Sequence, residues 1–301
     1  MKTGVGLGSL NLLVDDNGNK LTLEKKFEMM EIAKFDTIDF DLTCIEEIPE
    51  LADENTKEFD EYFLAIKELA KKHHLEIHQT HAPLTSFYHA MTNEYFNVCV
   101  RCIKATKLLG ADYIVIHPLQ PPTLIYDEGA DERKQLNLEF FTKLRPYLEK
   151  YDVIECIENL FRKDPERCNY APASCSRPEE ILYLIENLGS DRFQACLDIG
   201  HMLLTGDYTG DTPQGAIRKL GKHIKVLHVH DNFKKIDEHN PPFYGKGEWK
   251  EIVKALKEVG YDGVFNLEIT LYRYLTCDVR VYQHALNCIR QVADFDAILG
   301  E

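Results

Sequence analysis

The chain has 301 residues, of which 44% are hydrophobic, 10% aromatic and 28% charged. This composition is typical of a globular protein and excludes a disordered, collagen-like or low-complexity chain. Aspartate and glutamate number 50 against 35 lysines and arginines, so the formal charge is −15. Because nucleic acids are bound by clustered cations and the sequence has no run rich in lysine or arginine, we expect a small substrate and no nucleic acid partner.

Targeting and membrane signals are missing from the sequence. No apolar stretch reaches the roughly 20 residues of a membrane-spanning helix, and the first residues lack a cleavable signal pattern. Nine scattered cysteines, an odd number, fit a reducing compartment better than a disulfide framework. Cys99 and Cys102 form a CxxC pair within an apolar helical pattern, without a second pair to complete a zinc site. We therefore expect a cytoplasmic protein with buried, reduced thiols and no membrane contact.

Short runs of β-branched or aromatic residues recur along the chain at intervals of roughly 32 to 40 residues. They predict eight strands, which begin near residues 4, 37, 77, 113, 153, 193, 225 and 264. Apolar residues at helical spacing predict helices at Phe59–His74, Phe96–Leu109, Leu136–Lys150, Pro178–Leu188, Gln214–His223, Trp249–Gly260 and Val281–Ile298. Repeated alternation of strand and helix predicts a parallel sheet closed into a (β/α)8 TIM barrel, a single domain that covers residues 1–301. A doubly wound open sheet is the alternative, but the segment GVGLGSLNLL lacks its G-x-G-x-x-G motif.

Polar side chains lie at the ends of six expected strands, where a barrel places its active site. They are His78, Gln79 and His81, then His117, then Glu155, Glu158 and Asn159, then Asp198 and His201, then His228, His230 and Asp231, and finally Glu268. One such residue alone would be a structural or helix-capping group. Converging carboxylates repel one another unless a cation lies among them, so the set predicts a divalent metal centre. Carboxylates combined with imidazoles suit Mn²⁺, Co²⁺, Mg²⁺ or Zn²⁺.

The order of the strand-end motifs resembles one known superfamily. THAP, IHP, IENL, LDIGH, HVHD, P-x-x-G-x-G-x-W and NLE follow one another as in the xylose isomerase-like TIM barrels, and most closely as in the sugar phosphate isomerase/epimerase family. The resemblance covers nearly the whole chain. It implies one divalent ion (Mn²⁺, Co²⁺, Mg²⁺ or Zn²⁺) held by four residues: Glu158, Asp198, His228 and Glu268.

The same resemblance implies roles around the substrate. Glu158 and Glu268 would lie on opposite faces of the substrate as acid and base. Substrate contacts are implied for five further residues: His81, His117, His201, His230 and Lys234. His81 and His117 hold a second metal ion in some relatives, and Lys234 stands where an arginine often contacts the sugar.

The resemblance implies a metal-dependent isomerase or epimerase that abstracts a proton next to a carbonyl through a metal-stabilised enediolate. Its substrate would be a small carbohydrate, with or without a phosphate. The candidate phosphate-binding cations are Arg162, Lys234, Lys246 and Arg273, none of which forms a phosphate loop. An inosose dehydratase-like lyase begins with the same proton abstraction and is the nearest alternative. A barrel that binds metal without catalysis is disfavoured because all four implied ligands are present, and a homo-oligomer is compatible with either function.

AP endonuclease IV shares most of these motifs and is the second alternative. Its third metal needs an Asp-x-His pair before the G-x-G turn that follows the seventh strand. At the matching spacing from Gly245, we place that pair at His239 and Pro241, and proline offers no ligand atom. Together with the charge of −15, an incomplete third site predicts that the chain is not a nuclease.

Overall fold

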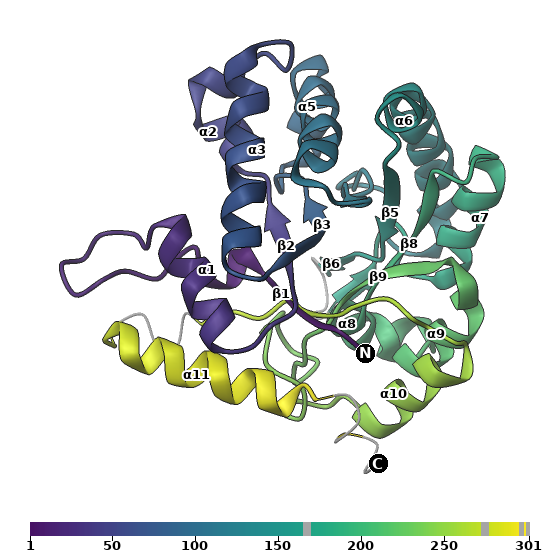
Figure 1. The fold of residues 1–301 in the computed structure, drawn as a ribbon. Coiled ribbons are helices and arrows are strands. Elements are labelled where there is room, and N and C mark those ends of the chain that lie inside the picture. Colours follow the sequence, from purple (N-terminus) through teal and green to yellow (C-terminus); the bar gives the residue numbers. More distant parts are fainter. Residues whose placement is uncertain (165–169, 272–276, 295–297, 299–301) are drawn as a thin grey trace.

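Eight parallel strands form the centre of the computed structural model, which describes residues 1–164, 170–271, 277–294 and 298 (Figure 1). The strands are β1 (Thr3–Gly6), β2 (Thr37–Asp41), β3 (Glu76–His81), β4 (Tyr113–Val115), β5 (Ile154–Glu158), β8 (Phe193–Asp198), β9 (Ile224–His228) and β10 (Phe265–Leu267). They pair in the order β10-β1-β2-β3-β4-β5-β8-β9. A parallel bridge between Val229 and Leu267 joins the end of β9 to β10 and brings the two edges together. The predicted TIM barrel is confirmed.

Helices surround the sheet and cover its outer face (Figure 1). The longer ones are α1 (Leu23–Ile32), α3 (Lys57–Lys72), α5 (Asn93–Leu109), α6 (Ala130–Tyr151), α7 (Pro178–Leu188), α8 (Ile199–Thr209), α9 (Pro213–Leu220), α10 (Trp249–Glu258) and α11 (Val279–Val292). Short turns of helix are α2 (Cys44–Glu47), α4 (Phe87–Ala90), η1 (Leu7–Leu10), η2 (Pro49–Leu51), η3 (Asp127–Gly129) and η4 (Gly221–His223). None of the described helices is long and apolar enough to cross a membrane.

All of the predicted helices are found, with ends that differ by a few residues from the predicted bounds, most of all in α6, which begins at Ala130, and in the last helix. The last was predicted over Val281–Ile298, but α11 ends at Val292, and residues 295–297 lie outside the described part. The prediction did not include α1, α8 or an antiparallel hairpin of β6 (Phe161–Lys163) and β7 (Tyr170–Pro172). Helix α8 follows β8 without a loop, because the Asp198 side chain at the strand end accepts a hydrogen bond from the His201 backbone N–H and caps the helix.

Below its carboxyl end, the barrel interior is apolar on the side of β4, β5, β8 and β9, whereas Asp39, Gln79 and Asn266 are buried polar residues on the side of β2, β3 and β10. Val115, Cys156, Cys196 and Val226 form a separate buried cluster inside the ring of strands. Cys99 and Cys102 are buried on the face of α5 that packs on the barrel, and burial raises the pKa of both thiols well above the ordinary cysteine value. These thiols contribute to the core, as expected from the sequence.

Glu155 on β5 is a fully buried carboxyl group outside the polar mouth of the barrel. Its Oε1 accepts a hydrogen bond from the Ile116 backbone N–H at 3.1 Å, and Oε2 has no hydrogen-bond partner among the described residues. Burial raises the pKa of Glu155 well above the usual glutamate value of 4.5, so the folded protein keeps its proton while the unfolded chain loses it.

Glu155→Gln is therefore expected to stabilise the protein as the pH rises. Below the unfolded-state pKa of Glu155, the contribution of its proton to the free energy of unfolding is fully present. Between the unfolded-state pKa and the raised folded-state pKa, the free energy of unfolding of the wild type falls by about 1.4 kcal/mol per pH unit. Glutamine keeps the acceptor for Ile116 and has no proton to lose. Urea unfolding at pH 4, 6 and 8 should show that the free energy of unfolding of the variant, relative to that of the wild type, increases with pH. A difference that stays constant from pH 4 to 8 would show that Glu155 is ionised in the folded state.

Candidate metal centre

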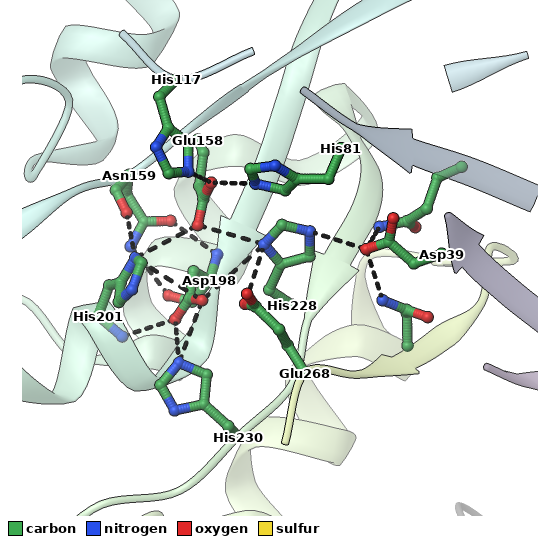
Figure 2. A network of polar contacts seen from close by, with 12 residues as sticks. Asp39, His81, His117, Glu158, Asn159, Asp198, His201, His228, His230 and Glu268 are labelled. Atoms are coloured by element: carbon green, nitrogen blue, oxygen red, sulfur yellow. Dashed lines mark hydrogen bonds and ion pairs between the residues drawn. The ribbon is translucent and has the colours of Figure 1, made fainter. Parts of the chain in front are cut away.

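Four side chains from the ends of four strands converge at the mouth of the barrel (Figure 2). Glu158, Asp198 and His228 end β5, β8 and β9, and Glu268 follows β10. One ligand atom from each lies within 4.8 Å of the others; we call these four residues the centre group. Three carboxylates and one imidazole at this spacing fit Mn²⁺, Co²⁺, Mg²⁺ or Zn²⁺. The four residues that the family resemblance implies as ligands are thus brought together.

Glu158 has an oxygen for each of two groups of histidines. Its Oε1 lies 3.2 Å from Nδ1 of His228 and 3.3 Å from Nδ1 of His201. Its Oε2 lies 2.9 Å from Nε2 of His117 and 3.6 Å from Nε2 of His81. His81, His117 and Glu158 form a second group within ligand distance, called here the second group. The carboxylate of Glu158 is therefore placed to bridge two cations.

A third group, named here the outer group, consists of His201, His230, Asp237 and His239. Nε2 of His239 lies 2.8 Å from the Asp237 carboxylate, and the rings of His239 and His230 stack with centroids 3.9 Å apart. Nε2 of His230 lies 3.1 Å from Asp198 of the centre group. The prediction that the Asp-x-His pair falls on His239 and Pro241 is wrong. Asp237 and His239, separated by Glu238, supply the pair two residues earlier, so a third cation site is complete in its ligand types.

A loop built around Asp231 carries two residues of the outer group, Asp237 and His239. The Asp231 carboxylate accepts hydrogen bonds from the Trp249 indole at 2.8 Å and from the Gly247 backbone at 2.9 Å. A side chain at Gly245 would come within 2.3 Å of the Asp231 carboxylate, so this position requires glycine. The P-x-x-G-x-G-x-W motif thus folds the loop between β9 and α10, and this loop places Asp237 and His239 over the barrel mouth.

Asn159 joins the two strands that carry Glu158 and Asp198. Its side chain donates to the Asp198 carbonyl oxygen and accepts from the Asp198 backbone N–H, both at 2.8 Å. Its own carbonyl oxygen lies 2.9 Å from Nδ1 of His201. The asparagine of the IENL motif therefore fixes the spacing of three residues of the site without facing a cation itself.

Buried carboxylates in the site remain charged because imidazoles surround them. Burial opposes ionisation of Glu158, but His228 and His117 outweigh burial and hold the pKa of Glu158 well below its usual range. His201 and His230 likewise overcome the burial of Asp198 and lower its pKa. Burial would also lower the pKa of His81, yet contact with Glu158 raises it to about 9. Since an imidazole must be neutral to bind a cation, cation binding here competes with protons.

A cavity of about 420 Å³ opens above the centre group. Its walls include seven of the predicted or corrected site residues: His81, His117, Glu158, His201, Asp237, His239 and Glu268. The Glu268 side chain is 32% exposed, whereas that of Glu158 is 1% exposed, so of these two carboxylates Glu268 is the more accessible to a substrate. None of the described residues that line this cavity is a lysine or an arginine.

The predicted cationic contacts lie elsewhere. Nζ of Lys234 is 3.0 Å from Asp207, and Lys234 does not line the cavity. Arg162 donates to the Gln120 carbonyl oxygen and borders a neighbouring hollow, and Lys246 is exposed. Arg273 lies outside the described residues. The substrate-binding roles of Lys234 and of the histidines remain predictions.

Gly200→Ala is expected to displace the ring of His230 and to destabilise the protein. A Cβ at Gly200 would lie 1.9 Å from the His230 ring, which is itself fully buried, so His230 must move and with it the contact to Asp198. Overpacking of this kind costs about 1–3 kcal/mol of unfolding free energy. Gly8→Ala is the matched control, because a Cβ there meets nothing within 4 Å. Equal unfolding free energies for the two variants would contradict the contact between Gly200 and His230.

Comparison with known proteins agrees with the barrel fold. A family model described as xylose isomerase-like TIM barrel matches residues 33–292. The chain therefore belongs to the xylose isomerase-like TIM barrel family.

Curated relatives include proteins with and without an assigned function. The uncharacterized protein MJ1311 of Methanocaldococcus jannaschii is 28% identical over 211 residues, which cover 67% of each chain. A probable endonuclease 4 of Mycoplasmopsis synoviae is 29% identical over 142 residues. That match covers 46% of each chain, so it spans less than half the length of this relative.

Solved structures share the fold along the whole chain. A D-tagatose 3-epimerase-like protein is 22% identical, with a TM-score of 0.66, over 97% of this chain and 99% of that chain. The IOLI protein, solved with a bound zinc atom, is 18% identical, with a TM-score of 0.69, over 100% of this chain and 98% of that chain. At these identities the likeness establishes the fold.

Proposed function

We propose that the protein is a divalent-metal-dependent isomerase or epimerase of a small sugar or sugar phosphate. The observation that carries the proposal is the cavity above the centre group. It has the size for a small molecule, and Glu268 reaches into it beside His228, whose Nδ1 lies 3.3 Å away. A polyanion would find no lysine or arginine among the described residues that line it. The likeness of the fold to sugar epimerases is consistent with this proposal.

The residues of the site would have separate roles in the reaction. A cation held by the centre group would polarise a substrate carbonyl and make the neighbouring C–H more acidic. Glu268, which is partly exposed, would accept the proton as general base. Glu158 is ionised in the resting site, so it would first take a proton from His81, whose Nε2 lies 3.6 Å from Oε2, and then return it on the other face, provided that Oε2 is not occupied by a cation shared with His81 and His117. His81, His117 and His201 would donate to substrate oxygens, and Phe161 packs edge-on against His201 at the cavity wall.

The test combines metal analysis with proton exchange. Purified protein, loaded separately with Mn²⁺, Co²⁺, Mg²⁺ and Zn²⁺, is incubated in D₂O with keto-sugars, their phosphates and cyclitols. We expect metal-dependent deuterium incorporation next to the carbonyl and its loss in Glu268→Gln. Deuterium incorporation followed by loss of water would instead assign the inosose dehydratase-like reaction. No incorporation into any member of the panel would contradict the proposal.

A phosphate-ester hydrolase is the second candidate, and the outer group favours it. The centre and second groups share Glu158, and the outer group borders the centre group through the contact of His230 with Asp198. Together the three groups could hold three cations, which is more than a proton transfer requires. Clustered cations can bind a phosphate directly, without lysine or arginine, and can activate water as the nucleophile. The number of cations bound per chain separates the candidates. One supports the isomerase, and three support the hydrolase.

A further inference from the structure

Asp39 is a buried carboxylate beside the centre group that the sequence analysis did not single out. It lies on β2, is 4% exposed and borders the cavity. Its Oδ2 lies 3.4 Å from Nε2 of His228, within ion-pair distance, and Nε2 has no hydrogen-bond partner among the described residues. The other ring nitrogen, Nδ1, faces Glu158 at 3.2 Å and Glu268 at 3.3 Å. The imidazole of His228 thus stands between Asp39 and the carboxylates of the centre group (Figure 2).

Two side-chain amides hold the Asp39 carboxylate in this position. Gln79 on β3 donates to Oδ2 at 3.0 Å, and Asn266 on β10 donates to the same oxygen at 3.2 Å. Oδ1 has no hydrogen-bond partner among the described residues. Three neighbouring groups from three different strands therefore converge on one oxygen, and the barrel itself fixes where that oxygen lies.

An imidazole binds a cation through one neutral nitrogen and carries its proton on the other. A carboxylate that accepts this second N–H fixes the tautomer, orients the ring and raises the basicity of the binding nitrogen. We propose that Asp39 is a positioning residue, which keeps the proton of His228 on Nε2 and presents the Nδ1 lone pair to a divalent cation. The inference rests on the centre group as the metal site of the proposed function.

The alternative is that Asp39 only completes the polar network with Gln79 and Asn266. A structural role of this kind would change the stability of the fold, whereas a positioning role changes the affinity for the cation. Asp39→Asn separates the two because the amide oxygen, at the place of Oδ2, can still accept from Gln79 and Asn266 and still faces Nε2 of His228. The substitution removes the negative charge behind His228 and puts the amide nitrogen where Oδ1 had no partner.

Asp41→Asn is the matched control. Asp41 lies two residues further along the same strand and borders the same cavity, so its substitution removes the same charge from a partly buried position. Its carboxylate bonds with Asn11 and with the Thr43 backbone and contacts no residue of the centre group. Any effect of long-range charge on cation binding should therefore appear in both variants, and an effect through His228 only in Asp39→Asn.

The experiment measures Zn²⁺ and Mn²⁺ affinity of the full chain by competition with a chromophoric chelator, beside thermal unfolding of the metal-free proteins. We expect Asp39→Asn to weaken the centre-group cation about 10- to 100-fold. Asp41→Asn should stay close to the wild type. Equal affinities of the two variants overturn the inference while leaving the metal centre intact. A wild-type protein that binds no cation overturns the centre group, and this inference with it.

Nitrogen-15 spectra of the zinc-loaded wild type give a second measurement that does not depend on how a variant folds. The inference predicts that His228 binds through Nδ1 and is protonated at Nε2. Binding through Nε2, or a proton on Nδ1, overturns it.

Discussion

Replacing Glu158 by glutamine is expected to abolish turnover and to reduce the number of cations that the protein binds, with the barrel still folded. One oxygen of Glu158 faces His228 of the centre group, and the other faces His117 of the second group. Glutamine has nearly the same volume, but it is neutral and offers one oxygen instead of two. Loss of a residue that only hydrogen-bonds to a metal ligand lowers metal affinity or activity about 10- to 100-fold. Loss of a ligand that two sites share should therefore lower metal affinity and activity by more than about 100-fold.

Glu268→Gln is the comparison for this experiment. Glu268 belongs to the centre group alone, so its loss should stop turnover but leave any cation bound at His81, His117 and Glu158. Metal content and turnover are measured for both variants, and far-ultraviolet circular dichroism shows whether each variant is folded. Turnover at the wild-type level in both variants would show that neither carboxylate acts as acid or base. A cation count that falls equally in both would contradict the bridging position of Glu158.

The barrel could be predicted from the sequence because its strands repeat at a nearly regular interval and are buried on both faces. Helix α1 has a weaker amphipathic pattern than α3, with Lys25 and Lys26 early in the helix. Helix α8 is buried along its first two turns and joins β8 directly, so its apolar residues read as a continuation of the strand. Helix α8 therefore lacks the polar face that marks a surface helix in a sequence.

The centre group could be predicted because each of its residues ends a strand, and strand ends meet at one edge of a parallel barrel. The outer group could not be placed in the same way, because Asp237 and His239 lie on the loop between β9 and α10. Loop length follows no period, so counting back from Gly245 put the pair two residues too late. Asp39 was missed for another reason. Its role depends on His228, nearly two hundred residues away, and only the structure shows them in contact.

The strongest test of the proposed function compares cation count with reaction in Asp237→Asn. Under the isomerase proposal, one cation at the centre group is sufficient, and Asp237 lies outside that group. The variant should then keep its centre-group cation and retain deuterium exchange into the substrate within about tenfold. Wild type and variant should both fail to nick abasic duplex DNA at any metal concentration, since no lysine or arginine lines the described cavity.

The hydrolase gives the opposite result in the same experiment. If three cations act together on a phosphate, Asp237→Asn should lose one of them and with it most of the hydrolysis, because His201, His230 and His239 alone leave the third cation without a charged ligand. Nicking or phosphate release by the wild type that disappears in Asp237→Asn, together with no exchange into any sugar, would overturn the isomerase. The salt dependence then identifies the substrate, because a protein that grips several phosphates loses affinity steeply between 50 and 200 mM salt. A chain of charge −15 that acts on a small phosphate ester should show little such loss.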